Sequence, residues 1–95
     1  MYNKEQFQAW VASQDEGALV GMTASRCNCP LANFYKPADK KYKNIAMGKR
    51  KKTWAVELEF ISEEHQPWEM KFINDIDKLN RRLVSREEIL HALET

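Results

Sequence analysis

The sequence predicts a single α+β domain over residues 1–95, with about four helices packed on a two-stranded antiparallel hairpin. Three observations predict this class: one stretch of strict apolar alternation, apolar stripes at helical spacing in several segments, and helix-capping residues where those segments begin. A chain of 95 residues builds one hydrophobic core. Hydrophobic residues make up 43% of it and aromatic residues 11%, which excludes a disordered chain.

The first helix is expected at about residues 4–14. Asn3 is a suitable N-cap, Gln6 occupies the reciprocal capping-box position, and apolar residues follow at i, i+3 and i+4 spacing. Residues 15–17 (Asp-Glu-Gly) end this helix, because glycine adopts the left-handed conformation at little cost. Residues 18–28 show no sustained period and are therefore expected to form a loop.

A short second helix is predicted from Pro30, because proline suits the first turn of a helix. Leu31, Phe34 and Tyr35 repeat the i, i+3, i+4 spacing of a buried helix face. Pro37 disfavours helical geometry at the residue before it. We therefore expect this helix to stop just before Pro37.

The clearest strand is predicted at residues 53–60. Its apolar side chains alternate strictly with others: Trp54, Val56, Leu58 and Phe60. Weaker alternation over residues 42–47 predicts the partner strand, and residues 48–52 form the turn between them. The result is an antiparallel hairpin with a basic tip, and the helices must cover its apolar face because such a hairpin is marginal alone.

Two more helices are predicted in the C-terminal third. One begins at Pro67 and carries an apolar stripe: Trp68, Phe72, Ile73, Ile76 and Leu79. The last is capped by Ser85, with Glu88 as reciprocal partner and Val84 placed to pack on Ile89. The centre of the core is expected to consist of large aromatic side chains: Trp10, Trp54, Phe60, Trp68 and Phe72.

Charge is distributed unevenly along the chain. Residues 1–35 hold two basic and three acidic side chains (−1), residues 36–52 eight and one (+7), and residues 53–95 five and ten (−5), which gives the net charge of +1. A local positive field attracts anionic partners. Lysines neutralise phosphates and an interleaved tyrosine stacks on unpaired bases, so the segment predicts sequence-tolerant binding of nucleic acid or another polyanion. The predicted site residues are Lys36, Lys40, Lys41, Tyr42, Lys43, Lys49, Arg50, Lys51 and Lys52.

Two alternatives compete with this interpretation. The lysines also suit an ordinary solvated hairpin tip that is protected from edge pairing. The acidic C-terminal part favours a protein-interaction or regulatory module, which self-associates through its opposite charges into a homodimer or binds a protein partner. An enzyme is not expected, because the chain has no glycine-rich phosphate loop and neither His65 nor His91 has a sequence neighbour that suggests a catalytic pair.

The two cysteines do not match a metal motif. Cys27 and Cys29 are separated by one residue, and His65 and His91 lie 26 positions apart, whereas reliable zinc motifs use Cys-x2-4-Cys and a close histidine pair. We therefore expect no metal and no cofactor. Two interpretations of Cys29 stay open: a thiol whose pKa is lowered by the nearby helix N-terminus, and a buried structural thiol.

The sequence also lacks any long apolar segment. Its longest apolar stretches are three or four residues, and the N-terminus has no apolar signal region. We therefore expect no membrane association and a cytoplasmic location.

Several short motifs are spaced along residues 17–95. They are Gly21, Cys29-Pro30-Leu31-Ala32 with an aromatic at Tyr35, Pro67-Trp68 with Phe72, Ile76 and Asp77, and Val84-Ser85 with Ala92-Leu93. Together they resemble a group of small bacterial and phage-borne proteins of unassigned function, and the lysine-rich hairpin lies outside this pattern. The resemblance implies a small prokaryotic cytoplasmic protein and supplies no activity, cofactor or catalytic residue.

Overall fold

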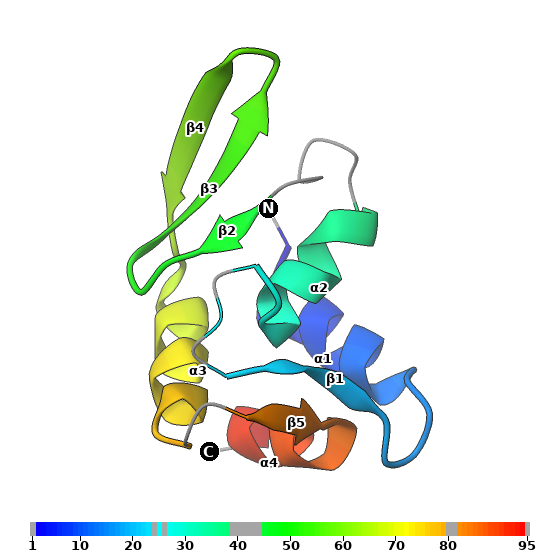
Figure 1. Cartoon of the computed structure of the whole chain (residues 1–95). Helices are drawn as coiled ribbons and strands as arrows, with labels where there is room; N and C mark the ends of the chain where they lie inside the picture. The colour runs from blue at the N-terminus through cyan, green and yellow to red at the C-terminus, as the bar shows by residue number, and fades with distance from the viewer. Residues whose placement is uncertain (1, 24, 26, 39–44, 80–81, 95) are drawn as a thin grey trace.

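The computed structural model describes residues 2–23, 25, 27–38, 45–79 and 82–94. Within these ranges it contains four helices and five strands, and the strands form one two-stranded and one three-stranded antiparallel sheet (Figure 1). The predicted α+β class and the four helices are confirmed. The strands differ from the prediction, because two small sheets stand in place of one hairpin.

Helices α1 (Lys4–Ala12) and α3 (Pro67–Asp77) begin where the sequence predicts. At the start of α1, the Asn3 side chain accepts a hydrogen bond from the Gln6 backbone N–H at 2.8 Å, and the Gln6 side chain accepts one from the Asn3 backbone N–H at 2.8 Å. This is the predicted capping box, which satisfies two N–H groups that have no partner inside the helix. Helix α1 ends two residues earlier than predicted, and α3 has proline at its first position.

The predicted start of α4 (Arg86–Glu94) is also confirmed. The Ser85 hydroxyl accepts a hydrogen bond from the Glu88 backbone N–H at 3.2 Å, and the Glu88 carboxylate accepts one from the Ser85 backbone N–H at 3.1 Å. Val84 and Ile89, the predicted apolar pair across this cap, are both fully buried members of the core.

Helix α2 (Pro30–Ala38) continues past Pro37, so the predicted stop before that residue is wrong. Leu31, Phe34 and Tyr35 of this helix are all buried. Burying each such side chain stabilises the helix by about 1.5–3 kcal/mol. Together they outweigh the cost of about 3 kcal/mol for a proline within a helix.

Strands β1 (Leu19–Met22) and β5 (Leu83–Ser85) pair in antiparallel fashion, with Gly21 opposite Val84. The prediction of a loop over residues 18–28 is therefore wrong for β1. Each strand is too short to show a period of its own, and its partner lies far away in the sequence. The pairing joins segments more than 60 residues apart, so neither segment alone indicates it.

The second sheet has the order β2 (Ala46–Met47), β3 (Lys51–Val56) and β4 (Glu59–Glu64). The predicted single strand over residues 53–60 is wrong, because a two-residue turn at Glu57 and Leu58 divides it into β3 and β4. Glu57 has a φ of 57°, in the left-handed region that such turns usually fill with glycine. A Glu-Leu turn has none of the residues that mark a turn in a sequence, so the alternation appeared continuous.

The predicted partner strand, residues 42–47, is described only from residue 45, and residues 42–44 lie outside the described residues. Ala46 pairs with Thr53 and Met47 with Lys52. The turn between β2 and β3 covers residues 48–50, so Lys51 and Lys52 belong to β3 and not to the turn.

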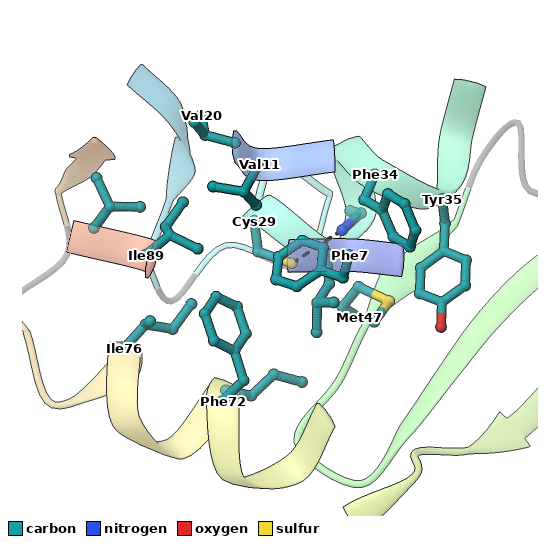
Figure 2. Packing of buried hydrophobic residues seen from close by; sticks show 14 of the residues in the cluster. Phe7, Val11, Val20, Cys29, Phe34, Tyr35, Met47, Phe72, Ile76 and Ile89 are labelled. Carbon is teal, nitrogen blue, oxygen red and sulfur yellow. Dashed lines mark hydrogen bonds between the residues drawn. The ribbon is translucent and has the colours of Figure 1, made fainter. Parts of the chain in front are cut away.

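Aromatic side chains from three helices meet in the core (Figure 2). The ring centroid of Phe7 in α1 lies 5.3 Å from that of Phe34 in α2 and 5.2 Å from that of Phe72 in α3. Four of the five aromatic side chains predicted for the core belong to it or pack against it: Trp10, Trp54, Trp68 and Phe72.

Phe60 is the exception, since its side chain is 82% exposed and the prediction that it lies in the core is wrong. Phe60 pairs with Ala55, while the next pair, Trp54 with Ile61, lies on the other face of the sheet. The turn before β4 therefore places Phe60 on the face opposite to Trp54, away from the helices.

Candidate polyanion-binding site

Three of the predicted site residues are consecutive and exposed: Lys49, Arg50 and Lys51. We call them the basic turn. Lys36 is half-buried, and its Nζ donates a hydrogen bond to the Cys27 carbonyl oxygen at 2.5 Å, so its ammonium already has a partner within the protein. Four predicted site residues lie outside the described residues: Lys40, Lys41, Tyr42 and Lys43. The structure thus brings three of the predicted residues together as one exposed, contiguous set.

Lys52 was also predicted to bind the polyanion, and this prediction is wrong because its side chain is fully buried. Successive residues of a strand point to opposite faces. Lys52 therefore shares the inner face of β3 with buried Trp54, while Lys51 points to solvent. Lys52 lies two positions before Trp54, so it belongs to the same alternating set of side chains. This spacing was the signal in the sequence that predicts the burial of Lys52.

Lys52 belongs to a buried ionic cluster with Glu69 of α3 and Tyr35 of α2. Its Nζ donates hydrogen bonds to both carboxylate oxygens of Glu69 at 2.9 Å, and the Tyr35 hydroxyl donates to Glu69 Oε2 at 2.9 Å. The Lys52 Nζ also lies 4.6 Å from the centroid of the Tyr35 ring, a cation–π distance. The buried charge is thereby paired, and β3 is fastened to both helices.

His65 connects this cluster to the basic turn. Its Nε2 lies 2.8 Å from the Gly48 carbonyl oxygen and donates a hydrogen bond to it, and its backbone N–H donates to the Arg50 carbonyl oxygen at 2.9 Å. The His65 Nδ1 lies 3.8 Å from Glu69 Oε2. Burial lowers the pKa of His65, because the protonated ring loses its hydration. The neutral ring therefore holds the turn in place.

The basic turn is closed by its own backbone as well. The Gly48 N–H donates a hydrogen bond to the Lys51 carbonyl oxygen at 3.0 Å. Lys51 faces Glu64 across β3 and β4, whereas Lys49 and Arg50 lie in the turn beyond that pair. A turn held at several points presents its cations without a large ordering cost on binding.

The sequence analysis missed Glu69 and the cluster around it. Glu69 lies three and four positions before Phe72 and Ile73, so it shares the buried face of α3, and a carboxylate in an apolar stripe is a sign of a buried partner. Lys52, Glu69 and Tyr35 are fully buried, so no substrate reaches them in this structure. Their arrangement acts as an anchor for the hairpin.

The two cysteines lie in opposite environments: Cys27 is exposed and Cys29 is buried, and both are free thiols. Burial raises the pKa of the Cys29 thiol to about 11 and outweighs the hydrogen bonds from backbone N–H groups. The interpretation that the helix N-terminus lowers this pKa is therefore wrong. The Cys29 Sγ accepts a hydrogen bond from the Ala32 N–H at 3.4 Å, at the start of α2.

We expect Cys27 to react rapidly with a thiol reagent in the native protein at about pH 8, because its side chain is exposed and that of Cys29 is buried. The Cys27→Ser variant should therefore lose the fast phase of the reaction and keep the stability of the wild type. Cys29 should react only after unfolding, and its replacement by serine should cost about 1–2 kcal/mol. Rapid reaction of both native thiols would contradict this assignment.

No cluster of three or more His, Cys, Asp or Glu side chains suited to a metal ion occurs within the described ranges. In the same part of the chain, no helix combines the length and apolar character needed to cross a membrane. The expected lack of a cofactor, the cytoplasmic location and the absence of enzymatic activity stay predictions.

Comparison with known proteins adds no relative from which a function can be transferred. No protein-family model matches the chain, and neither does any curated protein or solved structure. The resemblance to small bacterial and phage-borne proteins therefore stays a prediction, and the function is argued from the site alone.

Proposed function

We propose that this protein is a binding module whose basic turn contacts nucleic acid or another polyanion. The observation that carries the proposal is the exposure of three consecutive cations, Lys49, Arg50 and Lys51, on a turn that His65 and the backbone hold in place. Contacts of this kind neutralise phosphates and release their counterions, which supplies most of the affinity of sequence-tolerant binding.

The residue types favour tolerant binding over the reading of a defined sequence. Two of the three cations are lysines, which act as point charges, whereas bidentate recognition of a base is the property of arginine. Lys40, Lys41, Tyr42 and Lys43 precede the turn in the chain, and their contribution to the same surface stays a prediction.

Replacing Lys49, Arg50 and Lys51 together by alanine is expected to weaken binding to every oligonucleotide tested. If each cation neutralises one phosphate of a single strand, the slope of log affinity against log salt should become shallower by about 2. Fluorescence anisotropy with a labelled single-stranded oligonucleotide at about 50 and about 200 mM salt measures both quantities.

The matched control is the Lys71→Ala/Lys78→Ala variant, which removes two exposed cations of the α3 region that lie 2.8 and 3.9 Å from Asp75. This control should leave affinity nearly unchanged. The proposal fails if the wild-type protein does not bind at about 50 mM salt, or if its binding is independent of salt.

A protein-interaction module is the second candidate, and a specific observation favours it. Leu58 and Phe60 are 99% and 82% exposed at the end of the β3–β4 hairpin. Exposed apolar groups that lie together mark sites of protein contact more often than they serve in phosphate binding.

A further inference from the structure

The β3–β4 hairpin presents apolar side chains away from the rest of the molecule. In Figure 1 it extends at one end of the fold, while β5 and α4 lie at the other end. Leu58 is at the turn and Phe60 follows it in β4, and Val56 and Ile61 add exposed fractions of 40% and 39%. We call residues 56–61 the hairpin tip. Val56 and Ile61 share one face of the hairpin and Phe60 lies on the other, so Leu58 at the turn is the apolar side chain that is most available to a partner.

The turn of the hairpin tip is built against local preference. Glu57 holds a φ of 57°, although two-residue hairpin turns favour glycine, asparagine or aspartate at that position. Glu57 precedes Leu58 directly and Glu59 follows it, so two carboxylates flank the exposed leucine. Strain at an exposed turn is typical of a segment that is kept for contact with another molecule.

A pocket of about 390 Å³ lies at the opposite end of β3, beside the turn between β2 and β3. Its walls are partly apolar, from Cys29, Met47, Ile73 and Ile76, and it is large enough to receive a bulky side chain. Lys49 of the basic turn also lines it. Asp77 contributes a carboxylate to the wall and already has an interaction partner.

The hairpin tip is opposite in charge to the basic turn beside the pocket, and Leu58 matches the apolar part of the pocket walls. The tip combines exposed Leu58 with two flanking carboxylates. The pocket is lined by apolar side chains, by Lys49 and by Asp77, and Arg50, which follows Lys49 in the chain, adds an exposed cation next to the lining. The hairpin cannot fold back onto its own pocket, because the paired residues of β3 hold the two apart by roughly 20 Å. A second copy of the chain offers a matching pocket for each tip.

We propose that this chain forms a homodimer in which the hairpin tip of each copy docks into the pocket of the other. Leu58 enters between Met47, Ile73 and Ile76, while Glu57 and Glu59 face Lys49 and Arg50. Reciprocal docking uses the same two surfaces twice and closes the assembly at two copies. The occupant of the pocket is thus a segment of the same protein.

Sedimentation equilibrium on the full chain tests the proposal. The wild-type protein should have the mass of a dimer at about 100 μM, and the Leu58→Ser variant should dissociate at least about 10-fold more readily. The Leu19→Ser variant is the matched control, since Leu19 is 62% exposed on β1, outside the tip and the pocket. Its dimer should be unchanged. Circular dichroism should show the same folded state for both variants.

Charge reversal identifies the contacts. Lys49→Glu/Arg50→Glu and Glu57→Lys/Glu59→Lys should each weaken the dimer, because like charges then face each other across the contact. An equimolar mixture of these two variants, or all four changes in one chain, should restore it. Failure of both restorations overturns the proposed pairing.

Three other results would overturn the proposal: a wild-type monomer at about 100 μM, an assembly larger than a dimer, or a dimer insensitive to Leu58→Ser. This inference does not rest on polyanion binding, although the two share Lys49 and Arg50. Leu58→Ser separates them, because it leaves the whole basic turn in place. It should weaken the dimer at least about 10-fold and preserve the anisotropy signal with oligonucleotide.

Discussion

Replacing Glu69 with leucine is expected to lower the free energy of unfolding by about 3–5 kcal/mol. The change leaves the Lys52 ammonium buried without its counterion. It also removes the acceptor that lies 2.9 Å from both the Tyr35 hydroxyl and the Gln66 backbone N–H. Urea denaturation followed by tryptophan fluorescence measures this loss, and Trp54 is a suitable probe because it lies on the same strand face as Lys52.

A second variant shows that the loss comes from an unpaired charge. The double change Lys52→Met/Glu69→Leu removes both charges and replaces them with apolar side chains of similar size. Its stability should lie clearly above that of Glu69→Leu, because no unpaired charge is then buried, and below that of the wild type, because the Tyr35 hydroxyl and the Gln66 N–H still lack their acceptor. If Glu69→Leu alone lies within about 1 kcal/mol of the wild type, the cluster does not anchor the hairpin as described.

Replacing Gly21 with alanine is expected to cost about 3 kcal/mol, near the upper end of the usual range for overpacking. A Cβ atom at this position would lie 2.6 Å from the Pro30 nitrogen and 2.9 Å from both the Asn28 oxygen and the Cys29 carbonyl carbon. All three are backbone atoms, so no side-chain rotation relieves the contact. Strand β1 and the start of α2 must therefore separate, and thermal unfolding of the variant measures the cost.

Gly48→Ala is the matched control for this change. The new Cβ would meet one backbone atom, the Lys51 oxygen at 3.1 Å, and a shift of a few tenths of an ångström relieves that contact. It should be the milder variant by a clear margin. Equal losses for Gly21→Ala and Gly48→Ala would show that the close approach of β1 to α2 does not limit stability.

The helices were the most predictable part of the fold, because their signals are local. The capping boxes at Asn3 and Ser85 and the proline at the start of α3 act within one turn of chain, and each was found where the sequence indicated. The alternation around Trp54 likewise predicted a strand with that side chain in the core. Such signals depend on neighbours three or four positions away, which any reading of the sequence includes.

The candidate site was predictable only in part. The accumulation of cations pointed to Lys49, Arg50 and Lys51, which are exposed. Charge counting treated Lys52 as equivalent to them, although a shift of one residue along a strand reverses the face to which the side chain points. The adjacent lysines Lys51 and Lys52 therefore have opposite environments: one faces solvent and the other pairs with a carboxylate in the core.

Composition, capping and periodicity are properties of short segments, and they account for the α+β class, the helix starts and the basic character of residues 36–52. Long-range packing accounts for the rest: the pairing of β1 with β5, the burial of Lys52 against Glu69 and the exposure of Leu58 and Phe60. These features depend on which distant segments meet. The free energy of an ion pair or an apolar contact is set by its surroundings in the folded chain, and the surroundings of each side chain exist only after folding.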